Sequence, residues 1–466
     1  MAGRRSACAS GHKYLHLIAS SVGCEYVTIP EAFKRRWQRR YEQLVVEHLS
    51  PAQQLASGLR VLPSTASVFA SVQAAWRFYS NPRIRLPTLM SPLLETGRAA
   101  LARDRGAYAL VIHDWSLLHF GGHRSKPDRV TLSQSQDWGY ELQAALLASS
   151  ADGSPLAPLS LSLRAADGVH CSRSGKVRTP RSPLDELEPV MEFAERQELG
   201  KPAVHIIDAE ADSIGHYRSW LRKPGRFFVV RADDRTVQHE GEKRKFSQVL
   251  GLLWERQAFR RVREVTCRGR KAEQWVAESP VTLTAYARPN RLGEPRRYLR
   301  GAPVTLRLVI SQIRFADGSA APLTWFLLTN LPVEVDAPQV ALWYYWRWQI
   351  ESYFKLLKSA GQHVEQWQQE SAIALSRRLL VASMACVLVW QLARDDSQEA
   401  DQLRDILIRL SGRQMKRGCK FTLPALLAGL WTLLAMMSVL EQHDLQDLQR
   451  LATLILAPPR AGPRGR

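Results

Sequence analysis

Two short apolar runs, each ending in an aspartate, most constrain how this chain can fold. The first is 108–114 (YALVIHD) and the second is 203–208 (AVHIID). Runs of this length that are rich in β-branched residues and bounded by turn formers are typical of buried strands in a mixed or parallel sheet. Such sheets bind their ligands at the carboxyl edge, where Asp114 and Asp208 would then lie. Either aspartate alone is also a common turn former or helix cap.

A third carboxylate lies in a segment with the pattern of an amphipathic helix, 341–361. Its polar stripe combines a phenol, two cations and a carboxylate: Tyr344, Arg347, Glu351 and Lys358. Their spacing places all four within an arc of about 60° on one helix. This combination suits a hard metal ion beside phosphate oxygens. The competing interpretation is a solvent-exposed helix with ordinary charge pairs.

Together the three carboxylates predict a catalytic metal centre. Asp114, Asp208 and Glu351 would come from two strand ends and a helix. Three carboxylates can hold two divalent cations roughly 4 Å apart, which activate a water or a 3′-hydroxyl and stabilise the leaving oxygen of a phosphodiester. We therefore expect these residues to be metal ligands and catalytic residues, with two Mg²⁺ ions as cofactors and Mn²⁺ as a substitute.

These residues resemble the DDE transposases of the insertion-sequence-four family, bacterial cut-and-paste enzymes with an RNase H-like core. The helix has their Tyr-x2-Arg-x3-Glu-x6-Lys signature at 344–358, and 207–212 (IDAEAD) has their Asp-x-Glu-Ala-Asp form. In that form the first aspartate is the metal ligand, which favours Asp208 over Glu210 and Asp212. The resemblance therefore implies DNA cleavage at transposon ends and strand transfer into target DNA.

The resemblance covers about residues 64–366 and implies further contacts with DNA. The family has a strand whose closing arginine contacts DNA near the cleavage site, and 226–231 resembles it. A tryptophan in another strand stacks on a base that is flipped out of the duplex, and 322–329 resembles that strand. The implied DNA contacts are Tyr344, Arg347, Lys358, Arg231 and Trp325. Trp325 also suits a core position, because its run is apolar.

The first aspartate departs from the family pattern. The best-known members have a Thr-Thr pair after it, whereas Trp115 and Ser116 follow Asp114. The assignment of Asp114 therefore depends on its strand context.

Composition agrees with a nucleic-acid substrate. The formal net charge is +20 and the isoelectric point is about 10.0, so attraction to polyphosphate that weakens with salt is expected. Basic residues cluster at 34–40, 256–271 and 288–300. The expected partners are transposon terminal inverted repeats and target DNA. The six cysteines lack CxxC spacing, which argues against a zinc site or a disulfide framework and favours a cytoplasmic, nucleoid-associated protein.

The predicted fold is α/β, an RNase H-like catalytic core with a β-rich insertion, flanked by N-terminal helical and C-terminal all-α domains. The predicted parts are a helical DNA-binding region (1–100), the catalytic core (101–370) with its insertion (about 215–338), and a helical domain with a disordered tail (371–466). The insertion is expected because the stretch from Asp208 to Glu351 far exceeds what a crossover needs. Residues 1–62 match no pattern.

The uncharged stretch 421–440 is long enough to cross a bilayer, but it contains Pro424 and Gly429 and is followed by a polar helix. We expect a buried helix of the C-terminal domain, through which two monomers pair on two DNA ends, and no membrane partner. Two alternatives remain open: a transposase-derived DNA-binding protein without catalysis, and a metal-dependent nuclease of the same core. Intact carboxylates at Asp114, Asp208 and Glu351 favour the active enzyme.

Overall fold

The structure is a computed structural model that describes residues 35–49, 65–180, 182–267, 269–287, 298–315, 317, 320–440 and 443–456. Three expectations concern segments wholly or largely outside the described residues: the start of the N-terminal region, most of the basic cluster 288–300, and the tail 457–466.

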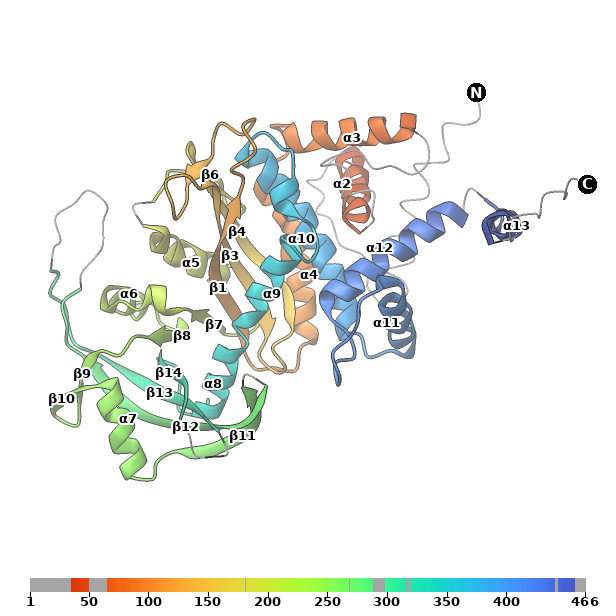
Figure 1. Ribbon diagram of the computed structural model, residues 1–466. Helices are drawn as coiled ribbons and strands as arrows, with labels where there is room; N and C mark the ends of the chain where they lie inside the picture. Colours follow the sequence, from red (N-terminus) through yellow and green to blue (C-terminus); the bar gives the residue numbers. More distant parts are fainter. Residues whose placement is uncertain are drawn as a thin grey trace, which may run out of the picture.

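One large mixed sheet forms the centre of the fold (Figure 1). Within the described residues it has fourteen strands, in the order β10-β9-β12-β13-β14-β8-β7-β1-β3-β4-β5-β6, with β11 paired to β12 and β2 to β3. The strands are β1 (Ala109–His119), β2 (Val130–Thr131), β3 (Trp138–Ser149), β4 (Pro155–Ala165), β5 (Gly168–Cys171), β6 (Gly175–Val177), β7 (Ala203–Ile207), β8 (Phe227–Ala232), β9 (Thr236–His239), β10 (Glu242–Lys245), β11 (Arg260–Cys267), β12 (Arg270–Leu283), β13 (Val304–Phe315) and β14 (Ala320–Thr329). The sheet with its helices confirms the α/β class.

Both apolar runs form buried strands, as predicted. β1 and β7 pair in parallel from Ala109 with Ala203 to Ile112 with Ile206, and β8 continues the parallel set beside β7. β1 does not end at Asp114, however, because it stays paired with the antiparallel β3 as far as His119. Asp114 therefore lies just past the point where β7 ends. The parallel pairing of β1 with β7 stops there, but β1 itself continues.

Helices cover both faces of the sheet, and those near the C-terminus of the chain lie beside it (Figure 1). They are α2 (Arg35–His48), α3 (Thr65–Ser80), α4 (Leu86–Arg103), α5 (Leu187–Glu195), α6 (Ile214–Trp220), α7 (Phe246–Glu255), α8 (Ala337–Tyr345), α9 (Trp348–Leu357), α10 (Ala372–Arg394), α11 (Gln398–Ser411), α12 (Leu423–Leu440) and α13 (Leu445–Leu456), with the short 3-10 helices η2 (Pro183–Glu186), η3 (Ala209–Ala211) and η4 (Val364–Gln366). The longest of these, α10, packs on β4 and contacts α2, α3, α4, α9, α11 and α12, so it joins the N-terminal helices to the core.

The expected single helix over 341–361 is wrong in detail, because it is divided into α8 and α9. At the junction the amides of Arg347, Gln349 and Ile350 each donate to the carbonyl three residues earlier. Such bonds tighten a helix locally. α9 then ends at Leu357, before Gly361, the last residue of the expected helix, and Lys358 is its C-cap with φ −94° and ψ −112°.

The strand-rich region after β8 extends the core sheet at one edge and does not form a separate layer. β14 pairs with β8, and β13, β12 and β9 follow outward. Beneath these strands α6 and α7 enclose a second apolar core that contains Tyr217, Trp220 and Phe228.

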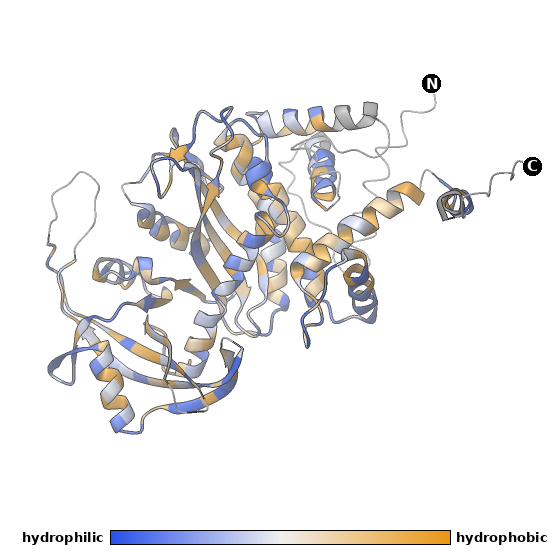
Figure 2. Cartoon of the chain, viewed as in Figure 1, coloured by the Kyte–Doolittle hydropathy of each residue, from blue (hydrophilic) through white to orange (hydrophobic). Residues whose placement is uncertain are grey.

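Among the helices of the described residues, one, α10, is long and apolar enough to cross a membrane by length and composition. Its apolar window is 94% buried inside the protein, as in the core helix of a folded domain. α12, which covers the stretch considered above, is largely hydrophobic in Figure 2 and packs on α10 and α11.

Two histidines meet inside the sheet, His113 of β1 and His205 of β7. Their ring nitrogens Nε2 and Nδ1 are 2.9 Å apart and both side chains are fully buried. Burial lowers the pKa of His113 to about 3 and the pKa of His205 well below its ordinary value. Both imidazoles are therefore neutral in the folded protein across the neutral range.

We expect this pair to make the protein acid-sensitive. Below about pH 6.5 the two histidines are protonated in the unfolded chain but stay neutral in the folded protein. The free energy of unfolding therefore falls as the pH decreases, by up to about 1.4 kcal/mol per pH unit for each histidine. Urea unfolding between pH 5 and pH 7.5 measures this slope. Replacing both histidines by asparagine should flatten it, whereas His119→Asn, at an exposed site on the same strand, should not. Equal slopes in all three proteins would contradict the prediction.

Candidate active site

Arg347 lies at the centre of the predicted carboxylates. Its Nη1 donates to Asp114 Oδ2 at 2.8 Å, and its Nη2 donates to Glu351 Oε1 at 3.2 Å and lies 3.0 Å from Asp208 Oδ2. The guanidinium is only 8% exposed. Residues far apart in the chain thus surround one buried cation.

Local structure sets the direction of each aspartate. Asp208 follows β7 and is the N-cap of η3, where its Oδ1 accepts a hydrogen bond from the amide of Ala209 at 2.7 Å. Asp114 accepts one from the amide of Trp115 at 2.9 Å. Because β1 and β7 are parallel neighbours, both carboxylates lie just beyond the last residues that pair these two strands, although β1 itself continues past Asp114.

Two further predicted residues contact Asp208, and a third packs behind them. Tyr344 donates its hydroxyl to Asp208 Oδ1 at 3.1 Å, and Arg231 Nε forms an ion pair with the same oxygen at 2.7 Å. Trp325 lies behind them: its ring packs edge-on against Tyr344, with centroids 5.1 Å apart and an interplanar angle of 72°. Trp325 is half-buried. It therefore reaches the carboxylates through Tyr344 and not directly.

Lys358 extends to the strand that carries Asp114. Its Nζ donates to the carbonyl of Leu117 at 2.6 Å and to Ser116 Oγ at 3.4 Å. Glu365 Oε1 lies 3.5 Å from this ammonium and also accepts the amide of His119 at 3.0 Å. The helical position of Lys358 is lost, but its side chain still faces the site.

The carboxylates differ in their affinity for protons. Burial raises the pKa of Asp114 to about 6, against the lowering effect of Arg347, and the neighbouring Asp208 and Glu351 add to the rise. Burial also acts on Asp208, but Arg347, the Ala209 amide and Arg231 outweigh it and lower the pKa of that carboxyl. The pKa of Arg347 is raised because its carboxylate partners outweigh its burial.

An open cavity of about 580 Å³ exposes this cluster to solvent. It is lined by Asp114, Trp115, Ser116, Asp208, Arg347, Glu351, Phe354, Lys355, Lys358, Ser359 and Glu365. Lys355 and Glu365 were not among the predicted site residues. The sequence could have indicated Lys355, because it lies one helical turn after Glu351. It could not have indicated Glu365, because the position of that residue depends on the turn after α9. Trp348 was also missed and is 51% exposed beside Arg347.

The three carboxylates are of the ligand type that a hard divalent cation takes, but in this structure Arg347 is the positive group that they contact. Three carboxylates whose oxygens converge on one positive group are the ligands that Mg²⁺ prefers. In the described part of the chain no three His, Cys, Asp or Glu side chains are arranged as a ready metal site. Metal binding would therefore require Arg347 to release these oxygens.

Comparison with known proteins adds one match. Residues 181–388 match the model of the transposase DDE domain, a segment that contains every predicted site residue except Asp114. No curated protein matches the chain. Asp114 joins the set through its contact with Arg347, which lies inside the match. The match over 181–388 supports a DDE transposase acting on DNA.

Proposed function

We propose that the protein is a DDE transposase of the insertion-sequence-four type, which cleaves DNA at transposon ends and joins them to target DNA. The observation that carries this proposal is the convergence of Asp114, Asp208 and Glu351 on Arg347 at the rim of an open cavity. A structural ion-pair network would need no such opening. The family signature at 344–358 supports the assignment.

The side chains divide into two roles. Asp114, Asp208 and Glu351 would hold the metal ions, and two bound Mg²⁺ ions would supply the activation of the attacking water or 3′-hydroxyl and the stabilisation of the leaving oxygen. The Arg347 guanidinium would release the carboxylates and bind a DNA phosphate instead, because carboxylates and phosphates are both anions that a guanidinium binds bidentately. Lys358 and Lys355 extend the cationic wall along which a phosphate backbone can lie.

The wider architecture supports an RNase H-like core. β1, β7 and β8 form the parallel centre with β3 and β4 antiparallel beside it, and the extra strands β9 to β14 fit the β-rich insertion of the family. We further propose that two copies act together on two DNA ends, and that the substrate places the protein at the nucleoid.

Metal-dependent cleavage of the element's own end DNA tests the function. A labelled duplex of the terminal repeat with its flank should be cut with Mg²⁺ or Mn²⁺, bound but not cut with Ca²⁺, and joined to a plasmid when the 3′-end is supplied. Cleavage without joining would identify a nuclease of the same core. Binding without cleavage under every metal would identify a DNA-binding protein that has lost catalysis.

Trp325 is proposed to stack on a base extruded during second-strand cleavage. Trp325→Ala should leave first-strand nicking nearly intact but reduce the second-strand or hairpin step, since stacking is worth roughly 1–3 kcal/mol per base. An abasic site at the extruded position should restore much of the loss. Because the ring also packs on Tyr344, nick yields and a melting curve must be measured together. Equal loss of both steps with a lowered Tm would indicate a core residue instead.

A further inference from the structure

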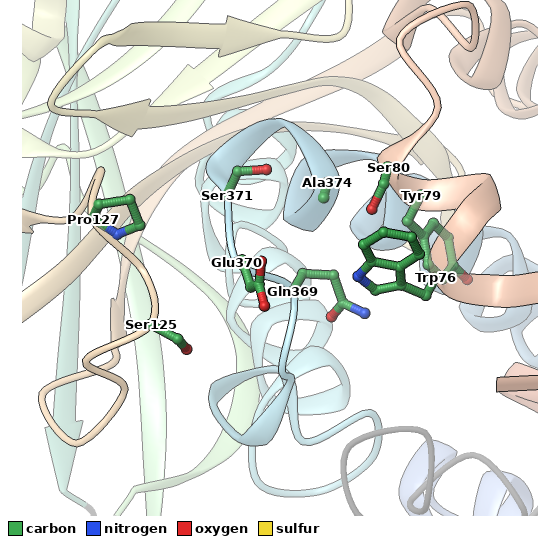
Figure 3. A pocket seen from close by; sticks show the side chains of 9 residues that line it. All are labelled: Trp76, Tyr79, Ser80, Ser125, Pro127, Gln369, Glu370, Ser371 and Ala374. Carbon is green, nitrogen blue, oxygen red and sulfur yellow. The ribbon is translucent and has the colours of Figure 1, made fainter. Parts of the chain in front are cut away.

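A second pocket lies outside the carboxylate site and has a volume of about 330 Å³. It is lined by Trp76, Tyr79, Ser80, Ser125, Pro127, Gln369, Glu370, Ser371 and Ala374. Figure 3 shows the end of α3 on one side, the loop before β2 on the other, and the segment leading into α10 between them. We refer to it as the Trp76 pocket.

The Trp76 pocket offers an aromatic face that the fold leaves open. Trp76 is 55% exposed, although the neighbouring Phe78 and Tyr79 of the same helix are buried. A large exposed indole beside a concave surface is a typical stacking platform for a planar ligand.

Polar groups beside the indole supply one donor and one acceptor. Gln369 Oε1 accepts a hydrogen bond from buried Arg378 at 3.0 Å, which fixes the amide so that its Nε2 donor remains for a ligand. Glu370 is exposed and forms no ion pair within the described part of the chain. A donor and an acceptor next to a stacking face match the edge and face of a nucleobase.

The wall that carries these groups is held in place before any ligand binds. Buried Lys126 donates to the carbonyls of Trp367 and Gln369, at 2.8 and 2.5 Å. Asp128 accepts the amide of Ala372 at 2.7 Å and so caps α10. Pre-organisation of this kind reduces the entropy that a ligand loses on binding.

Two exposed arginines are sequence neighbours of lining residues, although neither lines the pocket itself: Arg77 follows Trp76, and Arg124 precedes Ser125. Exposed arginines commonly contact nucleic-acid phosphates.

We propose that the Trp76 pocket binds an unpaired base of DNA, stacked on Trp76 with its edge against Gln369 and Glu370. This inference rests on the proposed function, because it assumes a DNA substrate. The base can come from the flank of the transposon end or from the target. Every unpaired base carries an N–H donor for Glu370 and an acceptor for Gln369, so the site is expected to accept any base.

Binding of four DNA probes tests the proposal. Two probes are transposon-end duplexes and two are unrelated target duplexes, and one of each pair is fully paired while the other has a short single-stranded extension. Fluorescence anisotropy with Ca²⁺ measures the affinity for each probe. Trp76→Ala should weaken binding of an extended probe about five- to 150-fold, the equivalent of one lost stacked base, and leave paired probes unchanged. Trp76→Phe should retain most of the affinity. The probe pair that responds identifies the source of the base.

Two controls make the result decisive. Trp138→Ala removes an exposed tryptophan outside the pocket and should change nothing. Glu370→Gln should weaken binding of the extended probes and leave the paired probes unchanged. Two results would overturn the base site and leave the proposed function standing, provided that the wild type binds and cuts DNA. In one, Trp76→Ala weakens binding of the paired and extended probes equally, and in the other it weakens the binding of neither. If the wild type binds none of the probes, both are overturned.

Discussion

Replacing Asp114, Asp208 or Glu351 singly by alanine should abolish DNA cleavage and leave end binding within a few-fold. Each carboxylate would hold metal ions that contribute several kcal/mol to the transition state, so the cleavage rate should fall by roughly a thousand-fold or more. Binding should persist because its free energy comes mainly from cations and phosphates. Single-turnover cleavage and gel-shift titration with each variant measure the two effects.

Glu210→Ala is the matched control for these variants. Glu210 belongs to the same Asp-x-Glu-Ala-Asp segment but is exposed and lies outside the cavity lining. It should cleave like the wild type. Cleavage by Asp114→Ala at the wild-type rate would show that the first ligand is assigned wrongly, which matters because Asp114 alone lies outside the matched domain.

Arg347→Ala should destabilise the protein without metal and make its stability depend on divalent cations. Removing the guanidinium leaves three partly exposed carboxylates close together without their shared counterion, which should cost less than the roughly 3–5 kcal/mol typical of a fully buried ion pair. Mg²⁺ or Ca²⁺ that binds only the folded state should recover part of this loss. Thermal unfolding of the variant in EDTA and in excess cation gives both quantities without requiring activity.

Arg404→Ala separates metal binding from a general loss of packing. Arg404 is also 8% exposed and donates to two carbonyls near the end of α10, far from the carboxylates in sequence. Its replacement should lower Tm by leaving the carbonyls of Leu392 and Asp395 without their donor, and added cations should not restore it. If cations raise the Tm of Arg347→Ala by no more than they raise the Tm of Arg404→Ala, the carboxylates do not form a metal site.

The sequence predicted the elements of the site better than their junctions. β1 and β7 follow from two β-branched apolar runs, because burial on both faces of a parallel sheet requires such runs. The division between α8 and α9 was not predicted. Hydrogen bonds to the carbonyl three residues earlier tighten the helix at this point, but they leave the spacing of its apolar residues nearly unchanged. Lys358 illustrates the result: its place on a continuous helix was wrong, yet its ammonium still reaches Ser116 and Leu117.

Sequence by itself determined the carboxylates, the cations and the strands and helices that carry them, because these depend on residue type and on periodicity over a few residues. Only the tertiary structure decided that Arg347 binds all three carboxylates, that Trp325 packs on Tyr344, and that Glu365 faces Lys358. It also created the Trp76 pocket from three distant segments. Such contacts follow from the pairing of strands and the packing of α10 across most of the chain, and no local pattern encodes which distant side chains then meet.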